Sequence, residues 1–228
     1  MKVVVTAGPS YEPIDEVRRL TNFSTGELGT LLADRLARAG FEVVCLRGTG
    51  ATYPAAPGKC QYEPFTTNDD LLARLAKLSR AHEIAGVFHA AALCDFAVQR
   101  VEDRAGKNVE AAKIESRPGD GLTLHLAPAR KILRELRGLF PRAVIVGWKY
   151  ELIGSRADAL RKAWLQIGDN ETDACVLNGR AWGSGFAFCT PPDSICELGD
   201  KAELAESLAG WLKDFRRAKA VPEPKSTP

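Results

Sequence analysis

Several features are scarce or missing in this chain of 228 residues, and each absence narrows its function. No apolar run approaches the length of a membrane-spanning helix, and Met1 leads into a short β-branched segment rather than a basic and apolar leader. Lys plus Arg number 31 and Asp plus Glu number 29, so no overall charge favours a nucleic acid or a membrane surface. We therefore expect a cytoplasmic protein with no nucleic-acid or membrane partner.

Cysteines at metal-binding spacing are also absent. None of the six cysteines forms a CxxC pair, and the three histidines, at 82, 89 and 125, are not grouped with them. The sequence therefore predicts no protein-ligated metal site. Cys45, Cys175 and Cys189 lie in apolar runs and are expected to be small core residues in a reducing compartment.

Two common nucleotide-binding motifs, GxGxxG and GxxxxGK[ST], are missing from the chain. The first marks dinucleotide-binding sites and the second marks Walker-type phosphate loops. The sequence therefore supports neither a conventional nicotinamide site nor a Walker-type ATPase.

Strand-like and helix-like segments alternate along most of the chain. The runs at 3–5, 41–46, 84–92, 143–148 and 174–178 have the composition of buried strands, and 68–81 and 155–167 have helical spacing. This alternation predicts an α/β fold, a Rossmann-like doubly wound and mainly parallel sheet. We expect a single domain over 1–217, with a small appended β element near the C-terminus formed by a hairpin at about 185–198, and a disordered tail at 218–228.

The stretch TAGPSYEPIDEVRRLTNFSTGELG, from Thr6 to Gly29, joins the first predicted strand to the first predicted helix. A connection of this length exceeds the usual four to six residues or so, which favours a function. Its hydroxyls and glycines lead into a helix N-terminus, where unpaired N–H groups and the helix dipole favour an anion. We therefore expect a phosphate here. In the simpler alternative, Ser24 or Thr25 is only an N-cap, and Gly8 and Gly26 are turn residues.

Small and acidic residues follow the apolar run 84–92. In doubly wound sheets, ligands bind outside the carboxyl ends of the strands. Ala90 and Ala91 would let a ligand approach the backbone, and Asp95 offers an acceptor at the mouth of such a site. In the alternative, the alanines serve helix packing and Asp95 is a cap or turn residue.

Between residues 97 and 121 the sequence loses its periodicity and becomes charged. Long polar segments inside compact domains are often functional, which makes this one a candidate for a mobile flap. A solvated charged loop is the alternative.

Together these motifs resemble the phosphopantothenoylcysteine synthetase (phosphopantothenate–cysteine ligase) family, in the stand-alone form of the ligase domain of the bifunctional coenzyme A biosynthesis flavoprotein. The first stretch is similar to that family's TxGxTxEPxDxVRxxxNxSSGxxG, and AAALCDF to its AAAVxDF/Y element. The segments AKI, GWKYEL and CVLN resemble its flap lysine, GFxxET or SFKLET, and xVAN segments. The resemblance implies a homodimer that joins 4'-phosphopantothenate to L-cysteine through an acyl-nucleotide. CTP or ATP and Mg²⁺ would be required, and no flavin is expected.

The resemblance also implies roles by matching position. Asn22 would contact the activated acyl group, and Lys113 on the flap would serve the second step or the triphosphate. The residues implied to bind substrate or phosphate are Gly8, Arg18, Ser24, Thr25 and Gly26. Those implied to bind the nucleotide are Ala90, Ala91, Asp95, Lys149 and Lys162. For Lys162, a solvated helix face is an equal alternative.

The chain departs from the bacterial pattern at the flap and before the last parallel strand. Glu115 and Ser116 follow the flap lysine segment, and Gln166 and Asn170 stand where bacterial members carry lysines. Lys149 resembles the eukaryotic branch, which is associated with ATP, whereas bacterial members use CTP. A diverged nucleotide- or phosphate-binding relative and a ligase of a different acid are therefore alternatives. A Rossmann oxidoreductase is weaker, because GxGxxG and a Tyr-x-x-x-Lys pair are missing.

Overall fold

The computed structural model describes residues 1–55, 58, 60–115 and 121–220 of the chain. In these residues an eight-stranded sheet has the order β12-β11-β10-β9-β6-β1-β4-β5. Its parallel part consists of β1 (Lys2–Ala7), β4 (Glu42–Gly48), β5 (Cys60–Phe65), β6 (Ile84–His89), β9 (Val144–Tyr150) and β10 (Ala174–Asn178). The antiparallel hairpin of β11 (Phe186–Thr190) and β12 (Ser194–Leu198) continues the sheet beyond β10. The predicted α/β class and the predicted hairpin are confirmed, and the hairpin belongs to the main sheet.

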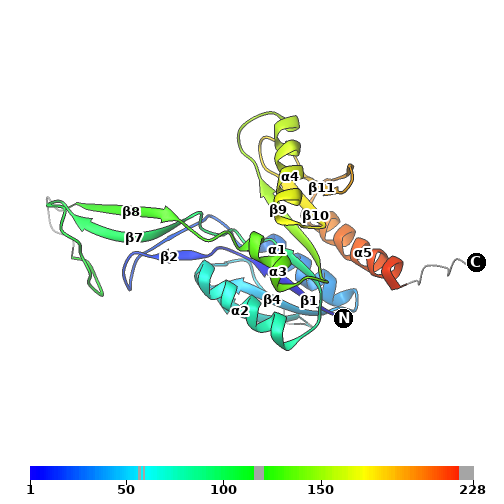
Figure 1. Ribbon diagram of the computed structural model, residues 1–228, viewed down its shortest axis with the longest axis horizontal. Helices are drawn as coiled ribbons and strands as arrows, with labels where there is room; N and C mark the ends of the chain where they lie inside the picture. Colours follow the sequence, from blue (N-terminus) through cyan, green and yellow to red (C-terminus); the bar gives the residue numbers. More distant parts are fainter. Residues whose placement is uncertain (56–57, 59, 116–120, 221–228) are drawn as a thin grey trace, which may run out of the picture.

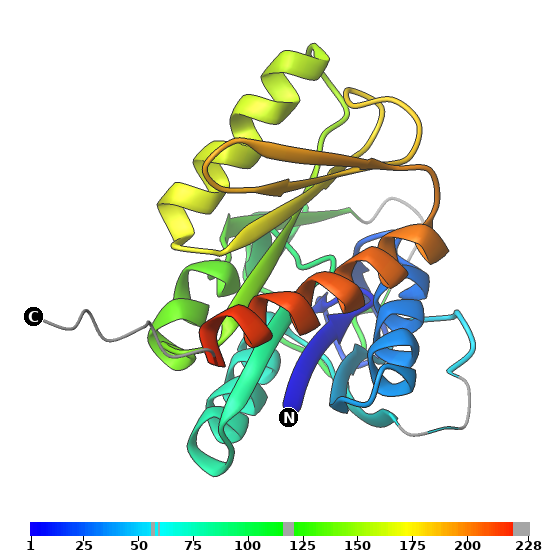
Figure 2. The same cartoon turned by 90° about the vertical axis from the view of Figure 1, so that its right-hand side faces the viewer.

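Helices cover both faces of the sheet (Figure 2). One face carries α1 (Glu27–Arg38) and α5 (Lys201–Ala220). The other carries α2 (Asn68–Ala81), α3 (Ile132–Leu139) and α4 (Arg156–Asn170). Thr67 is the N-cap of α2, and its side chain accepts from the N–H of Asp70 at 3.2 Å.

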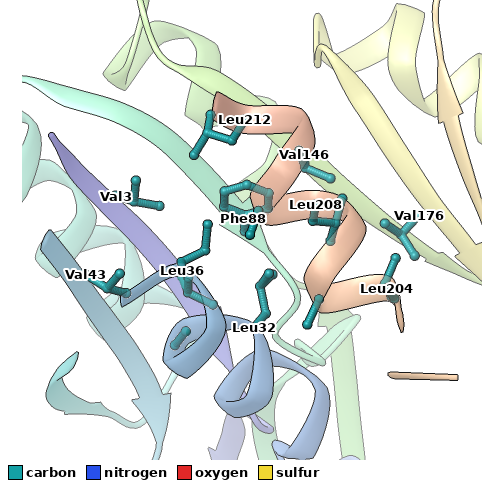
Figure 3. Close-up of a cluster of buried hydrophobic side chains, with 14 of the residues drawn as sticks. Val3, Leu32, Leu36, Val43, Phe88, Val146, Val176, Leu204, Leu208 and Leu212 are labelled. Carbon is teal, nitrogen blue, oxygen red and sulfur yellow. The ribbon is translucent and has the colours of Figure 1, made fainter. Parts of the chain in front are cut away.

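The core between the sheet and the α1–α5 face is built from alternate strand residues and helix leucines. Figure 3 shows leucines of α1 and α5 in one cluster, with Leu36 and Leu208 near Phe88. Leu204 lies farther along α5, beside Val176. Each fully buried side chain of this size contributes about 1.5–3 kcal/mol of hydrophobic stabilisation. This burial holds the strand ends, which carry the polar loops, in fixed positions.

A two-stranded ribbon projects from the α/β body, and we call it the arm (Figure 1). It consists of β7 (Phe96–Asp103), the described connection 104–115 and β8 (Leu122–Pro128). The segment 97–121 was predicted to be a flap; the structure shows that 97–103 belong to strand β7, and 116–120 lie outside the described residues. The strand signal in β7 is weak because a thin ribbon has little core, and within β7 only Val101 is buried.

The stretch from Thr6 to Gly29 is also more regular than a loop. It contains the short antiparallel pair β2 (Tyr11–Pro13) and β3 (Arg19–Thr21).

At the other end of the chain, α5 continues to Ala220. The predicted disordered tail is thus wrong for 218–220, where Ala-Lys-Ala favours helix, and 221–228 lie outside the described residues.

The chain passes from β1 to β4 on one side and later returns to β6 on the other, so the topological switch point lies between β1 and β6. Beyond these strand ends, the two outgoing segments stay together. The N–H of Ala92 donates to the carbonyl of Gly8 at 3.0 Å, and the N–H of Ser10 donates to the carbonyl of Ala92 at 3.2 Å. This pairing brings the two predicted polar segments into contact.

In the described part of the chain, no helix is long and apolar enough to cross a membrane.

Candidate functional site

The N-terminus of α1 meets the end of β1 through two glycines. Gly8 and Gly26 have φ angles of 79° and 77°. A Cβ on Gly26 would lie 2.9 Å from the Cβ of Ala51 and 3.2 Å from the Cα of Gly8. Gly26 is the N-cap and no side chain caps the helix, so the alternative that Ser24 or Thr25 is the N-cap is wrong. Both hydroxyls accept long bonds from nearby N–H groups, Ser24 from Gly26 at 3.4 Å and Thr25 from Glu27 at 3.3 Å.

Replacing Gly8 with alanine is expected to destabilise the protein more than replacing Gly40. Both residues have positive φ angles, 79° and 94°, so each alanine would cost about 1–2 kcal/mol in backbone strain. A Cβ on Gly8 would also lie 2.7 Å from the Cβ of Ala51, whereas nothing lies within 4 Å of a Cβ on Gly40. Overpacking adds about 1–3 kcal/mol. Urea unfolding of both variants measures the difference, and equal losses would show that the contact with Ala51 relaxes freely.

Asn22 joins the first polar stretch to the segment after β6. Its Nδ2 donates to the carbonyl of Ala92 at 3.2 Å and to the carbonyl of Leu93 at 2.9 Å. Within the described residues its amide oxygen accepts no hydrogen bond, and the side chain is exposed. The structure therefore holds Asn22 at the edge of the segment that carries Ala91 and Asp95.

Arg18 lies in a turn that holds the arm. Its Nη2 pairs with Asp15 Oδ2 at 2.5 Å and donates to the carbonyl of Ile114 at 2.6 Å. The hydrogen bond from Arg18, followed by backbone N–H donors that include Ile114, holds the pKa of Asp15 well below its usual range. The guanidinium is thus engaged by protein groups. The segment around Ile114 is held against this turn by a second bond, since the N–H of Glu16 donates to the carbonyl of Ala112 at 3.0 Å. Lys113 lies on the same segment, and its side chain is exposed.

A cavity of about 560 Å³ opens between α3, α4 and the carboxyl ends of β6 and β9. This volume falls within the range of small-molecule sites, about 300–1,000 Å³. Gly147 of β9 lets the wall residue Gln166 pack closely against the sheet, since a Cβ on Gly147 would lie 2.8 Å from Nε2 of Gln166. Its polar lining consists of His89, Asp95, Arg130, Lys131, Arg134, Lys149, Tyr150, Lys162, Gln166, Asp169 and Asn170.

Four of the residues predicted to bind the nucleotide line this cavity: Ala91, Asp95, Lys149 and Lys162. Ala90 does not, and neither do Asn22, Lys113 or the residues predicted to bind phosphate. The phosphate set is itself divided, because Gly8 and Gly26 meet at α1 whereas Arg18 is held in the turn beside the arm. Asn22 adjoins the cavity through Leu93, which is both its acceptor and a lining residue.

Glu151 organises the two predicted lysines. Its carboxylate lies 3.3 Å from Nζ of Lys149 and 2.5 Å from Nζ of Lys162. Burial acts to raise the pKa of Glu151, but the hydrogen bonds from Lys162 and Lys149 outweigh it and lower the pKa. Lys162 therefore does not lie on a merely solvated helix face. An anion entering the cavity would meet two ammonium groups that are already in place.

Sequence reasoning missed the cations that α3 brings to the cavity. Arg130 and Lys131 precede α3, Arg134 lies in its first turn, and Lys131 forms an ion pair with Asp95. These three cations lie after a strand and at the start of a helix, and that position was the signal in the sequence that could have indicated a ligand site. Gln166 and Asn170, noted above as departures, also lie in the cavity wall. In the part of the chain that the structure describes, no group of three or more His, Cys, Asp or Glu residues could hold a metal ion.

Comparison with known proteins connects this arrangement to a family. The model of the DNA/pantothenate metabolism flavoprotein C-terminal domain matches residues 1–209. The Coenzyme A biosynthesis bifunctional protein CoaBC of Thermococcus kodakarensis is 31% identical over 184 residues, which are 80% of this chain and 42% of that protein. The protein of the same name from Bacillus subtilis is 30% identical over 204 residues, 89% of this chain and 46% of that one. The chain thus spans less than half the length of either relative.

A solved structure shares the fold. The DNA/pantothenate metabolism flavoprotein from Streptococcus pneumoniae superposes with a TM-score of 0.82 at 23% identity, covering 94% of this chain and 99% of that one. The fold agreement extends over nearly the whole chain, as the family match does. The chain therefore belongs to the family of the DNA/pantothenate metabolism flavoprotein C-terminal domain, which confirms the resemblance drawn from its motifs.

Proposed function

We propose that this chain is a nucleotide-dependent ligase of coenzyme A biosynthesis that joins 4'-phosphopantothenate to L-cysteine. The observation that carries the proposal is the cationic cavity at the carboxyl ends of β6 and β9, with Asn22 bound to its edge. Family membership and the names of the two relatives support the pathway, and the ordered motifs support the reaction.

In the proposed first step, the substrate carboxylate attacks the α-phosphorus of the nucleoside triphosphate, and pyrophosphate leaves with the bonding electron pair. In the second step, the amine of cysteine attacks the acyl carbon, loses a proton, and expels the nucleoside monophosphate. Negative charge accumulates on the phosphates in the first step, so fixed cations lower its barrier. Lys149 and Lys162, held by Glu151, and Arg130 and Arg134 beside α3 supply that charge in our proposal.

Magnesium would accompany the triphosphate. Mg²⁺ is usually held by one or two carboxylates together with substrate phosphates rather than by an all-protein cage. The cavity wall fits that requirement, since it contains the carboxylates of Asp95 and Asp169. When bound, the ion would neutralise phosphate charge. No flavin takes part in the proposed reaction.

The proposed assembly is a homodimer in the cytoplasm, a compartment that contains nucleoside triphosphates and reduced cysteine. Support for the dimer comes from the arm, where Phe96, Leu122 and Leu126 are large apolar side chains exposed to solvent. Exposed apolar groups gathered on a projecting element are typical of a surface that a partner covers. Light scattering of the wild type and of Leu126→Lys tests this: a monomeric wild type would contradict it.

Pyrophosphate release tests the ligase. The assay contains Mg²⁺, phosphopantothenate and cysteine, and runs in parallel with CTP and with ATP. We expect sustained release with one nucleotide and only when both acid and amine are present, which would also settle the cosubstrate. Nucleotide binding without turnover would instead support a diverged binding relative or a ligase of another acid, an alternative favoured by the uncharged Gln166 and Asn170 in the wall.

Replacing Lys113 with glutamine is expected to lower the maximal rate at least tenfold while changing nucleotide affinity less than threefold, about 0.7 kcal/mol. The proposal gives Lys113 a role in the second step, so the loss should fall on chemistry rather than on binding. Lys107→Gln is the matched control, because Lys107 is another exposed lysine of the arm. Turnover and calorimetric titration of both variants separate the two quantities. A loss confined to affinity would make Lys113 a phosphate clamp.

A further inference from the structure

His89 is a buried residue of the cavity wall to which the proposed reaction assigns no role. It is the last residue of β6, and the residue is 7% exposed. Its Nδ1 lies 2.9 Å from the hydroxyl oxygen of Thr6, on the neighbouring strand β1. The pair therefore spans the topological switch point of the sheet.

The hydrogen bonds around Thr6 determine which ring nitrogen of His89 carries the proton. The hydroxyl oxygen of Thr6 accepts from the N–H of Ala91 at 3.2 Å. Thr6 is fully buried, and among the described residues Nδ1 of His89 is the acceptor within reach of its proton. Buried hydroxyl groups almost always find an acceptor. Thr6 therefore donates to Nδ1, and the ring proton sits on Nε2.

The same arrangement keeps the imidazole uncharged. A protonated ring would donate from both nitrogens and leave the Thr6 hydroxyl without an acceptor. Burial acts in the same direction and lowers the pKa of His89 to about 4. At neutral pH the residue thus presents one N–H donor with no formal charge, in a wall whose other donors include Lys149 and Lys162.

The Nε2–H group remains available to a ligand. Within the described residues, the ring makes one hydrogen bond, from Thr6 to Nδ1, and Nε2 is not a fully buried atom. The residue opposite His89 on β9 is Gly147, which has no side chain to cover the ring. An N–H group that lines a cavity and has no protein partner donates to water or to an acceptor oxygen of a ligand.

We propose that His89 is a ligand-binding residue of this cavity: held as the Nε2–H tautomer by Thr6, it donates one uncharged hydrogen bond to an acceptor oxygen of the bound nucleotide. Thr6 is then a positioning residue, because it acts through the imidazole. The inference rests on the proposed function, which makes a nucleoside triphosphate the occupant of the cavity.

Calorimetric titration with Mg²⁺-ATP and with Mg²⁺-CTP tests the donor. The substitution His89→Phe removes the N–H donor. The substitution His89→Gln keeps an N–H donor for the ligand and an oxygen acceptor for the Thr6 hydroxyl. We expect an approximately tenfold weaker Kd for His89→Phe and a change below about threefold for His89→Gln, the sizes expected for one hydrogen bond and its retention. Melting curves identify any variant that fails to fold.

Nitrogen-15 spectra of histidine-labelled wild-type protein give a reading that does not depend on a variant's folding. The chain has three histidines, so the spectra are simple. We expect the Nε2–H tautomer at His89 and a shift of that resonance on addition of nucleotide. Separate additions of inorganic tripolyphosphate and of the free nucleoside show whether the acceptor oxygen belongs to the phosphates or to the nucleoside.

The outcomes separate this inference from the proposed function. An Nδ1–H tautomer, or nucleotide binding by the wild type that His89→Phe leaves unchanged, would overturn the role of His89 and leave the ligase standing. Failure of the wild type to bind either nucleotide would overturn both.

Discussion

An Asn22→Asp variant is expected to lose at least about 100-fold in turnover at saturating substrate, because disrupting one preorganised polar group at a reacting centre typically costs about 10²–10³ in kcat. The side-chain Nδ2 now donates to the carbonyls of Ala92 and Leu93. A carboxylate cannot make those bonds, and its oxygens would repel the two carbonyl oxygens. It would also add negative charge beside the phosphates. Cysteine-dependent pyrophosphate release measures the loss.

A matched variant separates the site from the added charge. Asn108 is an exposed asparagine on the arm whose amide donates to Glu110, so Asn108→Asp introduces the same charge away from the cavity. We expect it to retain near wild-type turnover. The fold of Asn22→Asp should persist, because Asn22 is exposed and does not belong to the core. Unchanged turnover in Asn22→Asp would count against its placement at the acyl group.

The free energy of unfolding is expected to fall by about 3 kcal/mol as the pH is lowered from 6.5 to 4, through His89 alone. Burial lowers the pKa of His89 from its ordinary 6.5 to about 4, so between these values the unfolded chain binds a proton that the folded protein does not. Stability therefore decreases as the pH falls through this window. Urea titrations at half-unit pH intervals measure the slope.

The control is His89→Gln, which has no titrating group at this position and should flatten the slope. Carboxylates contribute in a different window. The pKa values of Asp15 and Glu151 are lowered from 3.8 and 4.5, so their stabilisation is present above those values and is lost only at lower pH. Burial raises the pKa of Glu12 above its ordinary 4.5, so the difference in slope between wild type and His89→Gln from pH 6 to 5, and not the slope itself, isolates the titration of His89. If wild type and variant keep the same slope there, His89 is not buried in its neutral form.

Local sequence patterns predicted much of the fold. The β-branched run Val3–Val5 is buried in β1, and the run predicted at 174–178 is strand β10 with the same bounds. These signals are readable because a strand covered on both faces must be apolar throughout. Strand β7 of the arm escaped prediction for the converse reason, since a ribbon with little core imposes no such pattern.

The candidate site was predicted only in part. Asp95, Lys149 and Lys162 were expected from motifs, and the structure places all three in one cavity. Arg134 and His89 were not expected, because a cation in a helix turn and a histidine at a strand end are unremarkable until the elements around them are packed. The engagement of Arg18 by Ile114 was equally unforeseeable, since 96 residues separate them.

The sequence by itself determined the order of the buried strands and of the helices between them, the apolar faces that bury them, and the motifs that place the chain in its family. Those properties depend on residues close together in the chain. Tertiary structure alone decided that α3 and α4 enclose the cavity, that Glu151 holds both lysines, and that Thr6 orients His89. These contacts depend on strand order, register and helix packing, which bring together groups as far apart as the 83 residues between Thr6 and His89.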